Sequence, residues 1–180
     1  INDVDTALLM PLEEGTILPA TVVGVNKGQA GTPGQLKGSF DSSGFLGSLQ
    51  ANTSRGIFGQ LESVNWADGQ AVEVAQNSQV HTGKATILSN ISGDQVEEYE
   101  IEIVKIFPDS QQDGRDYQIT VTDQRLLETT GGIVQGMSGS PILQDGRFIG
   151  AVTHVLINDP SCGYGISAQR MLSAAEKAAE

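Results

Sequence analysis

Ser138 lies in a run of small residues that could activate its hydroxyl. The segment GMSGSP, residues 136–141, places a glycine on either side of Met137-Ser138 and a proline at its end. A nucleophilic serine needs an exposed hydroxyl at a sharp turn, backbone N–H groups directed at the developing oxyanion, and a base within hydrogen-bond reach. Gly136 and Gly139 permit backbone angles that other residues resist, and the amides of Gly136 and Ser138 are candidates for an oxyanion hole. The pattern indicates an acyl-transfer site, and a tight turn of small residues is the alternative.

Two histidines are present in the sequence as candidate general bases for this serine. His154 follows Ser138 by sixteen residues within an apolar stretch, which favours a packed or groove-lining side chain. His81 stands in QVHTGK, which is typical of a turn. Asp123 precedes QRLLE, where a carboxylate commonly caps the first turn of a helix. The residues alone therefore leave the base and the acid of a catalytic triad open.

The sequence gives little support for metal or disulfide chemistry. Cys162 is the only cysteine, so no intrachain disulfide can form, and two histidines do not complete a zinc site around it. The carboxylates of 97–102 alternate along a predicted strand instead of wrapping a loop, so a calcium site is not expected. We expect neither a metal nor a cofactor.

The composition limits the possible partners. The 180 residues carry a formal charge of −12 and are 38% hydrophobic. The chain can therefore bury a core, while its surface repels phosphate backbones. Nucleic-acid binding is not expected. No run approaches the ~18 apolar residues that a membrane-spanning helix needs.

Most of the chain is predicted to form short strands between glycine-rich turns, as in an all-β domain. The segment 97–107 alternates clearly, with Tyr99, Ile101 and Ile103 on one face and three glutamates on the other. Asp145-Gly146 is a hairpin signal between two apolar runs in 141–157. Further strands are expected at 16–25, 56–61, 71–75, 84–91 and 117–123, with a long loop at 26–38.

Two helices are predicted among these strands. The segment 123–132 holds one short turn that its glycines end. The segment 167–180 reads as a C-terminal helix with Ser167 as its N-cap. Its apolar stripe consists of Ala168, Met171, Leu172 and Ala175.

The order of these elements resembles the second barrel of trypsin-like serine proteases. A G-x-S-G-x-P turn is followed by a hairpin, an apolar strand, a glycine-bounded strand and a terminal helix. This resemblance implies an all-β, two-barrel, trypsin-like (chymotrypsin-like) fold with a C-terminal helix. It places Thr153 and His154 on the strand that lines the substrate groove and pairs with an extended peptide.

The chain also resembles the SpoIVB (stage IV sporulation protein B) serine peptidases. The resemblance is carried by TDQRLLETTGGIVQGMSGSPILQDGRFIGAVTHVLINDPSCGYG, and by INDVDT, GIFGQL and YEIEIV. It implies a peptidase domain over 1–180, with the first barrel and connection at about 1–110 and the second barrel and helix at about 111–180. The family's motifs imply Ser138 as the nucleophile and Asp123 as the triad acid, with Asp3 and Asp5 as rivals.

The family's general base is a histidine in a Gly-His segment that comes just before the INDVDT motif. That position falls ahead of Ile1, so the 180 residues are expected to lack the base, together with strands that close the first barrel. Because the three triad groups act as a unit, we expect this chain by itself to be inactive or nearly so.

The family resemblance also implies a biological role. A SpoIVB peptidase is exported into the space between the two forespore membranes. There it cleaves itself and a membrane-bound regulator, which leads to activation of a sporulation sigma factor. A PDZ domain is expected upstream. Two other classes of protein remain open: a non-catalytic module that binds extended peptides in the protease groove, and an acidic structural domain of the spore envelope.

Overall fold

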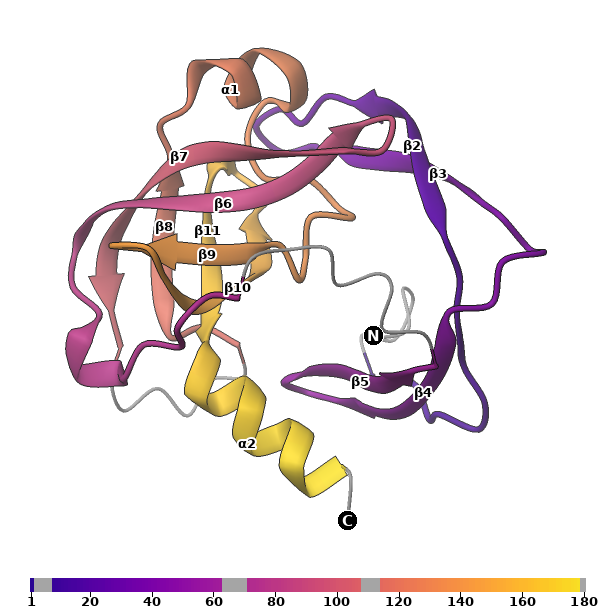
Figure 1. Ribbon diagram of the computed structural model, residues 1–180. Helices are drawn as coiled ribbons and strands as arrows, with labels where there is room; N and C mark the ends of the chain where they lie inside the picture. The colour runs from indigo at the N-terminus through magenta and orange to yellow at the C-terminus, as the bar shows by residue number, and fades with distance from the viewer. Residues whose placement is uncertain (2–7, 63–70, 108–113, 179–180) are drawn as a thin grey trace.

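The C-terminal half of the chain forms a closed antiparallel barrel. The computed structural model describes residues 1, 8–62, 71–107 and 114–178. Six strands close the barrel in the order β10-β11-β8-β7-β6-β9 (Figure 1). Their bounds are β6 Gly83–Ser92, β7 Gln95–Ile106, β8 Tyr117–Val121, β9 Pro141–Gln144, β10 Arg147–Leu156 and β11 Asp159–Ser167.

Alternation along these strands fills the barrel core. On β7, Tyr99, Ile101 and Ile103 are buried and the intervening glutamates are exposed, as the sequence predicts. The two faces of an antiparallel strand differ in this way when one faces a core and the other faces water. The core also contains Ile87, Ile119, Leu126, Ile133, Met137, Ile142 and Val152. This core supports the strand ends and turns that carry the candidate site.

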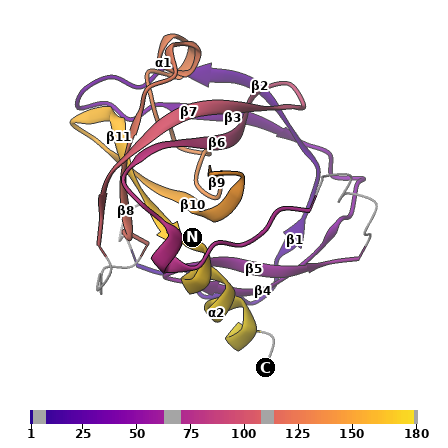
Figure 2. The same ribbon diagram turned by 60° about the vertical axis from the view of Figure 1, so that its left-hand side comes forward.

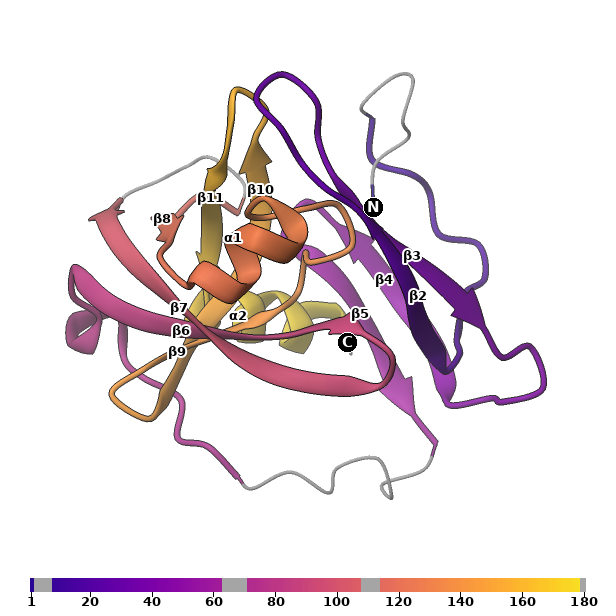
Figure 3. The same ribbon diagram turned by 90° about the horizontal axis from the view of Figure 1, so that it is seen from above.

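The N-terminal half forms two smaller sheets beside the barrel. Strands β1 (Thr16–Ile17), β4 (Gly47–Thr53) and β5 (Gly56–Leu61) pair in the order β1-β4-β5, and β2 (Ala20–Asn26) pairs with β3 (Gln35–Phe40) (Figure 3). The two halves therefore divide before β6, earlier than the predicted boundary near residue 110, because β6 and β7 pair within the barrel.

Three sequence predictions for this half were wrong in detail. The predicted strand 16–25 is two strands separated by Leu18-Pro19, since proline cannot donate to a sheet ladder. The predicted strand 71–75 is only an isolated bridge between Val74 and Phe148. The predicted loop 26–38 includes the start of β3, because its residues pair across the hairpin with β2. A short 3₁₀ helix, Asn77–Gln79, precedes β6.

The hairpin between β2 and β3 contacts the segment that leads to Ser138. The Gly28 N–H donates to Thr130 O at 2.8 Å, and the Leu36 N–H donates to Gln135 O at 2.8 Å. The Gln135 N–H in turn donates to Gly34 O at 2.9 Å. A Cβ on Gly34 would lie 2.5 Å from the Gly28 nitrogen, so this close approach requires glycine. The N-terminal half thus fixes the entry to the glycine turn.

Both predicted helices are present. Helix α1 (Gln124–Thr130) ends at Gly131, whose φ of 79° is left-handed. Helix α2 (Ala168–Ala178) begins after Ser167, whose hydroxyl oxygen accepts from the Arg170 N–H at 3.3 Å. It lies against β10, β11 and β5, below the barrel in Figures 1 and 2. Among the described residues, no helix has the length and apolar character to cross a membrane.

A buried carboxylate connects α2 to the barrel. Asp116, whose side chain is 5% exposed, accepts from the Ser167 N–H at 2.8 Å and pairs with Arg170 Nε at 3.2 Å. Replacing Asp116 with alanine leaves these donors without their acceptor, so we expect the free energy of unfolding to fall by about 2 kcal/mol in urea denaturation. The matched control is Arg147→Ala, which breaks the exposed Arg147–Glu73 pair and is expected to cost less than about 1 kcal/mol. Equal losses would show that Asp116 has no special anchoring role.

Candidate active site

Ser138 is exposed at the end of the glycine turn that joins α1 to β9. Its hydroxyl donates to the Thr153 carbonyl on β10 at 2.9 Å. The neighbouring Met137 is 1% exposed and packs in the barrel core. One residue of the turn is therefore held in the core while the next presents its hydroxyl to solvent. This is the exposure that a nucleophile requires.

Two backbone amides of the turn remain free to bind an oxyanion. Three other amides in it are satisfied: Met137 N–H donates to Val134 O (3.1 Å), Gly139 N–H to Val152 O (2.8 Å) and Ser140 N–H to Met137 O (3.0 Å). Within the part of the chain that the structure describes, the amides of Gly136 and Ser138 donate no hydrogen bond. Backbone N–H groups of this kind are what an oxyanion hole uses.

Gly136 has a backbone conformation that favours glycine. Its φ is 99°, which L side chains rarely adopt. A Cβ at this position would also lie 3.1 Å from the Cβ of Leu36 on β3. Both constraints explain why a residue without a side chain occupies this place next to Ser138.

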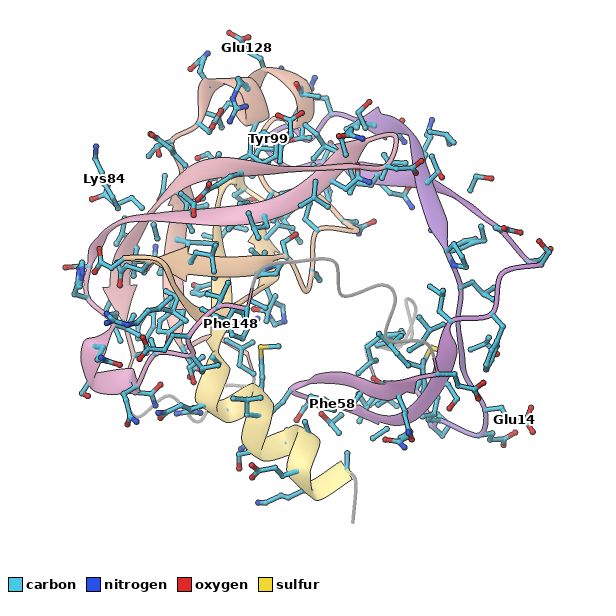
Figure 4. The ribbon with its side chains drawn as sticks, viewed as in Figure 1. Glu14, Phe58, Lys84, Tyr99, Glu128 and Phe148 are labelled. Carbon is cyan, nitrogen blue, oxygen red and sulfur yellow. The ribbon has the colours of Figure 1, made fainter. Side chains whose placement is uncertain are left out.

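A cleft of about 750 Å³ opens in front of Ser138. It lies between the barrel, helix α2 and the β4–β5 hairpin, which faces the barrel across the middle of Figure 1. Its lining includes Ser138, Gly139, Thr153, His154, Met171 and Phe58, and Figure 4 shows Phe58 on β5 next to α2. The serine and both residues predicted to line a substrate groove therefore share one cleft.

Beyond Val152, one edge of β10 has no neighbouring strand beside this cleft. Strand β10 pairs with β9 up to Ala151, and Val152 then hydrogen-bonds to Gly139 and Ser140 of the glycine turn. From there to Leu156 the only described strand that pairs with β10 is β11, and the Thr153 carbonyl accepts from the Ser138 hydroxyl. The Thr153 hydroxyl has the Gly114 and Tyr164 carbonyls as acceptors within hydrogen-bond distance, and its one proton binds to either of them, which holds this part of the strand. An extended peptide can pair with such an edge by adding a strand to the sheet.

The structure separates the two histidines. His154 lies on the cleft, but no hydrogen bond joins its ring to Ser138 among the described residues. His81 lies at the β9–β10 turn, where Nε2 contacts Asp145 Oδ2 at 3.0 Å and Nδ1 contacts Thr82 O at 3.0 Å. Neither histidine hydrogen-bonds to the Ser138 hydroxyl among the described residues.

The pKa values of the two imidazoles are shifted in opposite directions from the ordinary histidine value. The contacts with Thr82 O and Asp145 raise the pKa of His81. The cleft walls partly shield His154 from water, and this desolvation, with the charge of Arg115, lowers the pKa of His154. Proton NMR should give a higher midpoint for His81, with His81→Gln identifying its signal. Equal titration midpoints for the two histidines would contradict the predicted pKa shifts.

These shifts have opposite effects on stability. The contribution of His81 is fully present below its unfolded-state pKa and is lost as pH rises through the raised folded-state value. The neutral form of His154 is favoured in the fold, so its contribution is present above the unfolded-state pKa and is lost as pH falls towards the lowered folded-state value.

Asp123 occupies the N-cap of α1, as one of the two interpretations of the sequence predicts. Its carboxylate is 8% exposed and accepts from the Arg125 N–H at 2.9 Å and from Arg125 Nη2 at 2.9 Å. The Glu100 N–H is a further donor at 3.3 Å. These hydrogen bonds lower the pKa of Asp123, and the one from the Arg125 side chain contributes most. Asp123 is not among the described residues that line the cleft of Ser138.

The triad role of Asp123 stays a prediction, because a triad acid contacts the base and neither described histidine hydrogen-bonds to this carboxylate. The rivals Asp3 and Asp5 lie outside the described residues. Among the described residues, no group of three His, Cys, Asp or Glu side chains is placed to hold a metal ion. Sequence reasoning missed the β4–β5 hairpin as a wall of the cleft, since nothing local in residues 47–61 indicates what they face.

Asp123→Asn separates the two roles of this carboxylate. Asparagine is an equally good N-cap, so α1 should persist and the free energy of unfolding should fall by only about 1 kcal/mol, through the weakened contact with Arg125. Because Asp123 does not line the cleft and its oxygens accept from Arg125 and Glu100, we expect its loss to change the fluorophosphonate labelling rate of Ser138 less than about tenfold in a chain preceded by the family's Gly-His segment. Loss of a true triad acid would cost ~10⁴. If the substitution instead lowered the labelling rate of Ser138 by about 10⁴-fold, in a polypeptide whose unsubstituted form is labelled, Asp123 would be established as the triad acid.

A closed antiparallel barrel that presents an exposed serine, in a glycine turn, to an inter-sheet cleft defines a serine peptidase of trypsin-like fold. The chain belongs to the SpoIVB peptidase S55 family, whose family model matches residues 1–172. This finding confirms the family that the sequence resembles. No curated protein matches the chain.

Solved structures of a mycobacterial protease share the fold. The inactive form of the Rv3671c protease is 17% identical, with a TM-score of 0.53 over 82% of this chain and 73% of that chain. A serine-to-alanine mutant of Rv3671c from M. tuberculosis H37Rv, also in an inactive form, is 18% identical, with a TM-score of 0.54 over 92% of this chain and 80% of that chain. The all-β, trypsin-like fold predicted from the sequence is thereby confirmed, with one closed barrel and two smaller sheets among the described residues.

Proposed function

We propose that this chain carries the catalytic serine and the substrate groove of a SpoIVB-type endopeptidase. The observation that carries the proposal is Ser138, exposed on the cleft in a turn whose Gly136 and Ser138 amides donate no hydrogen bond among the described residues. Membership of the SpoIVB peptidase family supports the same assignment.

In the proposed mechanism the Ser138 hydroxyl attacks a peptide carbonyl held in the cleft. The substrate backbone pairs with the free edge of β10 at Thr153 and His154. The carbonyl oxygen gains negative charge as the tetrahedral intermediate forms, and the amides of Gly136 and Ser138 stabilise it. The hydroxyl must first leave the Thr153 carbonyl, because its proton has to pass to a base and not to a carbonyl acceptor.

We further propose that the base is the histidine of the family's Gly-His segment. Neither His81 nor His154 forms a hydrogen bond with Ser138 among the described residues, so neither is in place to accept its proton. The 180 residues alone should therefore show little or no hydrolysis. We call the chain preceded by the family's Gly-His segment the histidine-extended polypeptide.

The biological part of the proposal follows the family. We propose that the peptidase acts after export, in the space between the forespore membranes, and that an upstream PDZ domain accompanies it. It cleaves itself and a membrane-bound regulator, and thereby contributes to sporulation signalling. Family membership alone supports these statements.

A fluorophosphonate probe tests the enzymatic part. The probe phosphonylates an activated serine, so the histidine-extended polypeptide should be labelled at Ser138 and the 180-residue chain should be labelled far more slowly. Peptide mapping by mass spectrometry identifies the labelled residue. Absence of labelling in the extended polypeptide, when circular dichroism shows that it is folded, would reject the peptidase.

A non-catalytic peptide-binding module is the second candidate. It is favoured by one observation: the Ser138 hydroxyl is bonded to the Thr153 carbonyl, and no histidine contacts it among the described residues. An unlabelled extended polypeptide that still binds extended peptides, as measured by fluorescence anisotropy, would support this candidate.

A further inference from the structure

The cleft of Ser138 differs in charge from the rest of the protein. The sequence contains 22 acidic and 10 basic residues. Among the described residues that line the cleft, none is Asp or Glu, and the charged side chain is Arg55. The glutamates of β7 are exposed, and none of them lines this cleft. A local positive site in an acidic protein attracts negative groups to that site, since clefts focus the field of their lining charges.

Arg55 lies at the tip of the β4–β5 hairpin, on the wall opposite Ser138. The Arg55 N–H donates to Thr53 Oγ1 at 3.1 Å, and Thr53 Oγ1 donates to Gly56 O at 3.1 Å, so the turn is held by its own side chains. The guanidinium forms no ion pair with a described residue. The turn therefore fixes the backbone from which this exposed guanidinium extends, and the cation is available to a ligand.

A second arginine stands on the barrel side. Arg115 follows Gly114, which lines the cleft beside Thr153 and His154, and its guanidinium lies 5.3 Å from the ring centroid of Tyr164. Its charge reaches His154, whose pKa it helps to lower. Arg55 lines the groove and Arg115 adjoins it, so these two guanidinium groups are the fixed positive charges that a bound peptide would meet.

We propose that this cleft selects peptide segments with acidic side chains, through contacts to Arg55 on the hairpin and Arg115 on the barrel. This inference rests on the proposed function, because it names the substrate class of the same cleft. The guanidinium is suited to the task, since it forms paired hydrogen bonds with a carboxylate. Basic segments are disfavoured by the same two charges.

The test measures binding of labelled peptides to the 180-residue chain by fluorescence anisotropy. The probes are three ten-residue peptides that differ at two central positions, which hold Glu, Gln or Lys. We expect the Glu peptide to bind about tenfold more tightly than the Gln peptide at low salt, and the difference to shrink in 0.5 M NaCl as screening increases.

Charge-matched variants locate the effect. Arg55→Gln and Arg115→Gln should each weaken binding of the Glu peptide by about threefold to fivefold and leave the Gln peptide unchanged. Lys84→Gln removes the same charge from β6, away from the cleft (Figure 4), and should change Kd less than about 1.5-fold. Equal binding of all three peptides, no binding of any, or an equal loss in Lys84→Gln would overturn the inference.

Labelling of Ser138 distinguishes a failure of the proposed acidic preference from a failure of the proposed peptidase activity. If the histidine-extended polypeptide is labelled and the peptides show no charge preference, the peptidase stands and the acidic preference is rejected. If labelling is absent and the arginine-dependent preference persists, the acidic preference is retained and the protein is a non-catalytic peptide-binding module.

Discussion

Replacing Ser138 with alanine in the histidine-extended polypeptide is expected to lower kcat/KM for peptide hydrolysis by about 10⁴-fold to 10⁶-fold. The nucleophile, base and acid act as a unit, so removal of the nucleophile loses nearly all of their joint effect. The remaining rate enhancement comes from the oxyanion hole and from substrate binding. Peptide affinity should change little, because the groove is formed by β10 and the hairpin and not by the hydroxyl.

Ser140→Ala is the matched control in the same turn. Its hydroxyl contacts Ser89 Oγ at 3.2 Å and does not line the cleft among the described residues. Loss of one hydrogen bond of this kind costs about 1 kcal/mol of stability, and we expect kcat/KM to stay within about tenfold of the unmodified protein. If Ser138→Ala retained activity, or if both variants lost it equally, Ser138 would not be the nucleophile.

Local rules of sequence predicted the elements that carry the site. The alternation of β7, the turn at Asp145-Gly146 and the cap at Ser167 are each set by residues close together in the chain, and the structure confirms all three. At the turn, Asp145 and Gly146 both have positive φ, 52° and 74°, which suits a two-residue hairpin. The exposed serine between a buried methionine and a glycine is a local pattern too.

Contacts between distant segments were beyond such rules. Strand β4 has the sequence GSLQANT, which is poor in β-branched and aromatic residues, and it forms because it pairs with both β1 and β5. The place of Arg55 on the cleft depends on that pairing. Asp123 illustrates both cases. Its role as N-cap needs only the backbone N–H of Arg125, two residues along the chain, whereas its distance from Ser138 depends on the whole barrel.

Gly136→Ala tests the oxyanion hole, and we expect it to lower kcat in the histidine-extended polypeptide by about 10²-fold to 10³-fold with a smaller change in KM. An L side chain is strained at the φ of 99°, and its Cβ would press on Leu36 at 3.1 Å, so the backbone must shift and the Gly136 amide with it. Loss of one oxyanion donor has an effect of this size, because the donor acts mainly in the transition state.

Gly146→Ala separates this effect from backbone strain. Gly146 also has a positive φ, 74°, but a Cβ there would meet nothing within 4 Å, and the β9–β10 turn lies away from the cleft. Gly146→Ala should lose about 1–2 kcal/mol of unfolding free energy from the strained conformation. Gly136→Ala should lose at least as much, because its Cβ also presses on Leu36, and urea denaturation measures the difference between the two variants. Only Gly136→Ala should then lose kcat. If both variants kept full activity at equal stability, the oxyanion would have to be bound by donors other than the Gly136 amide.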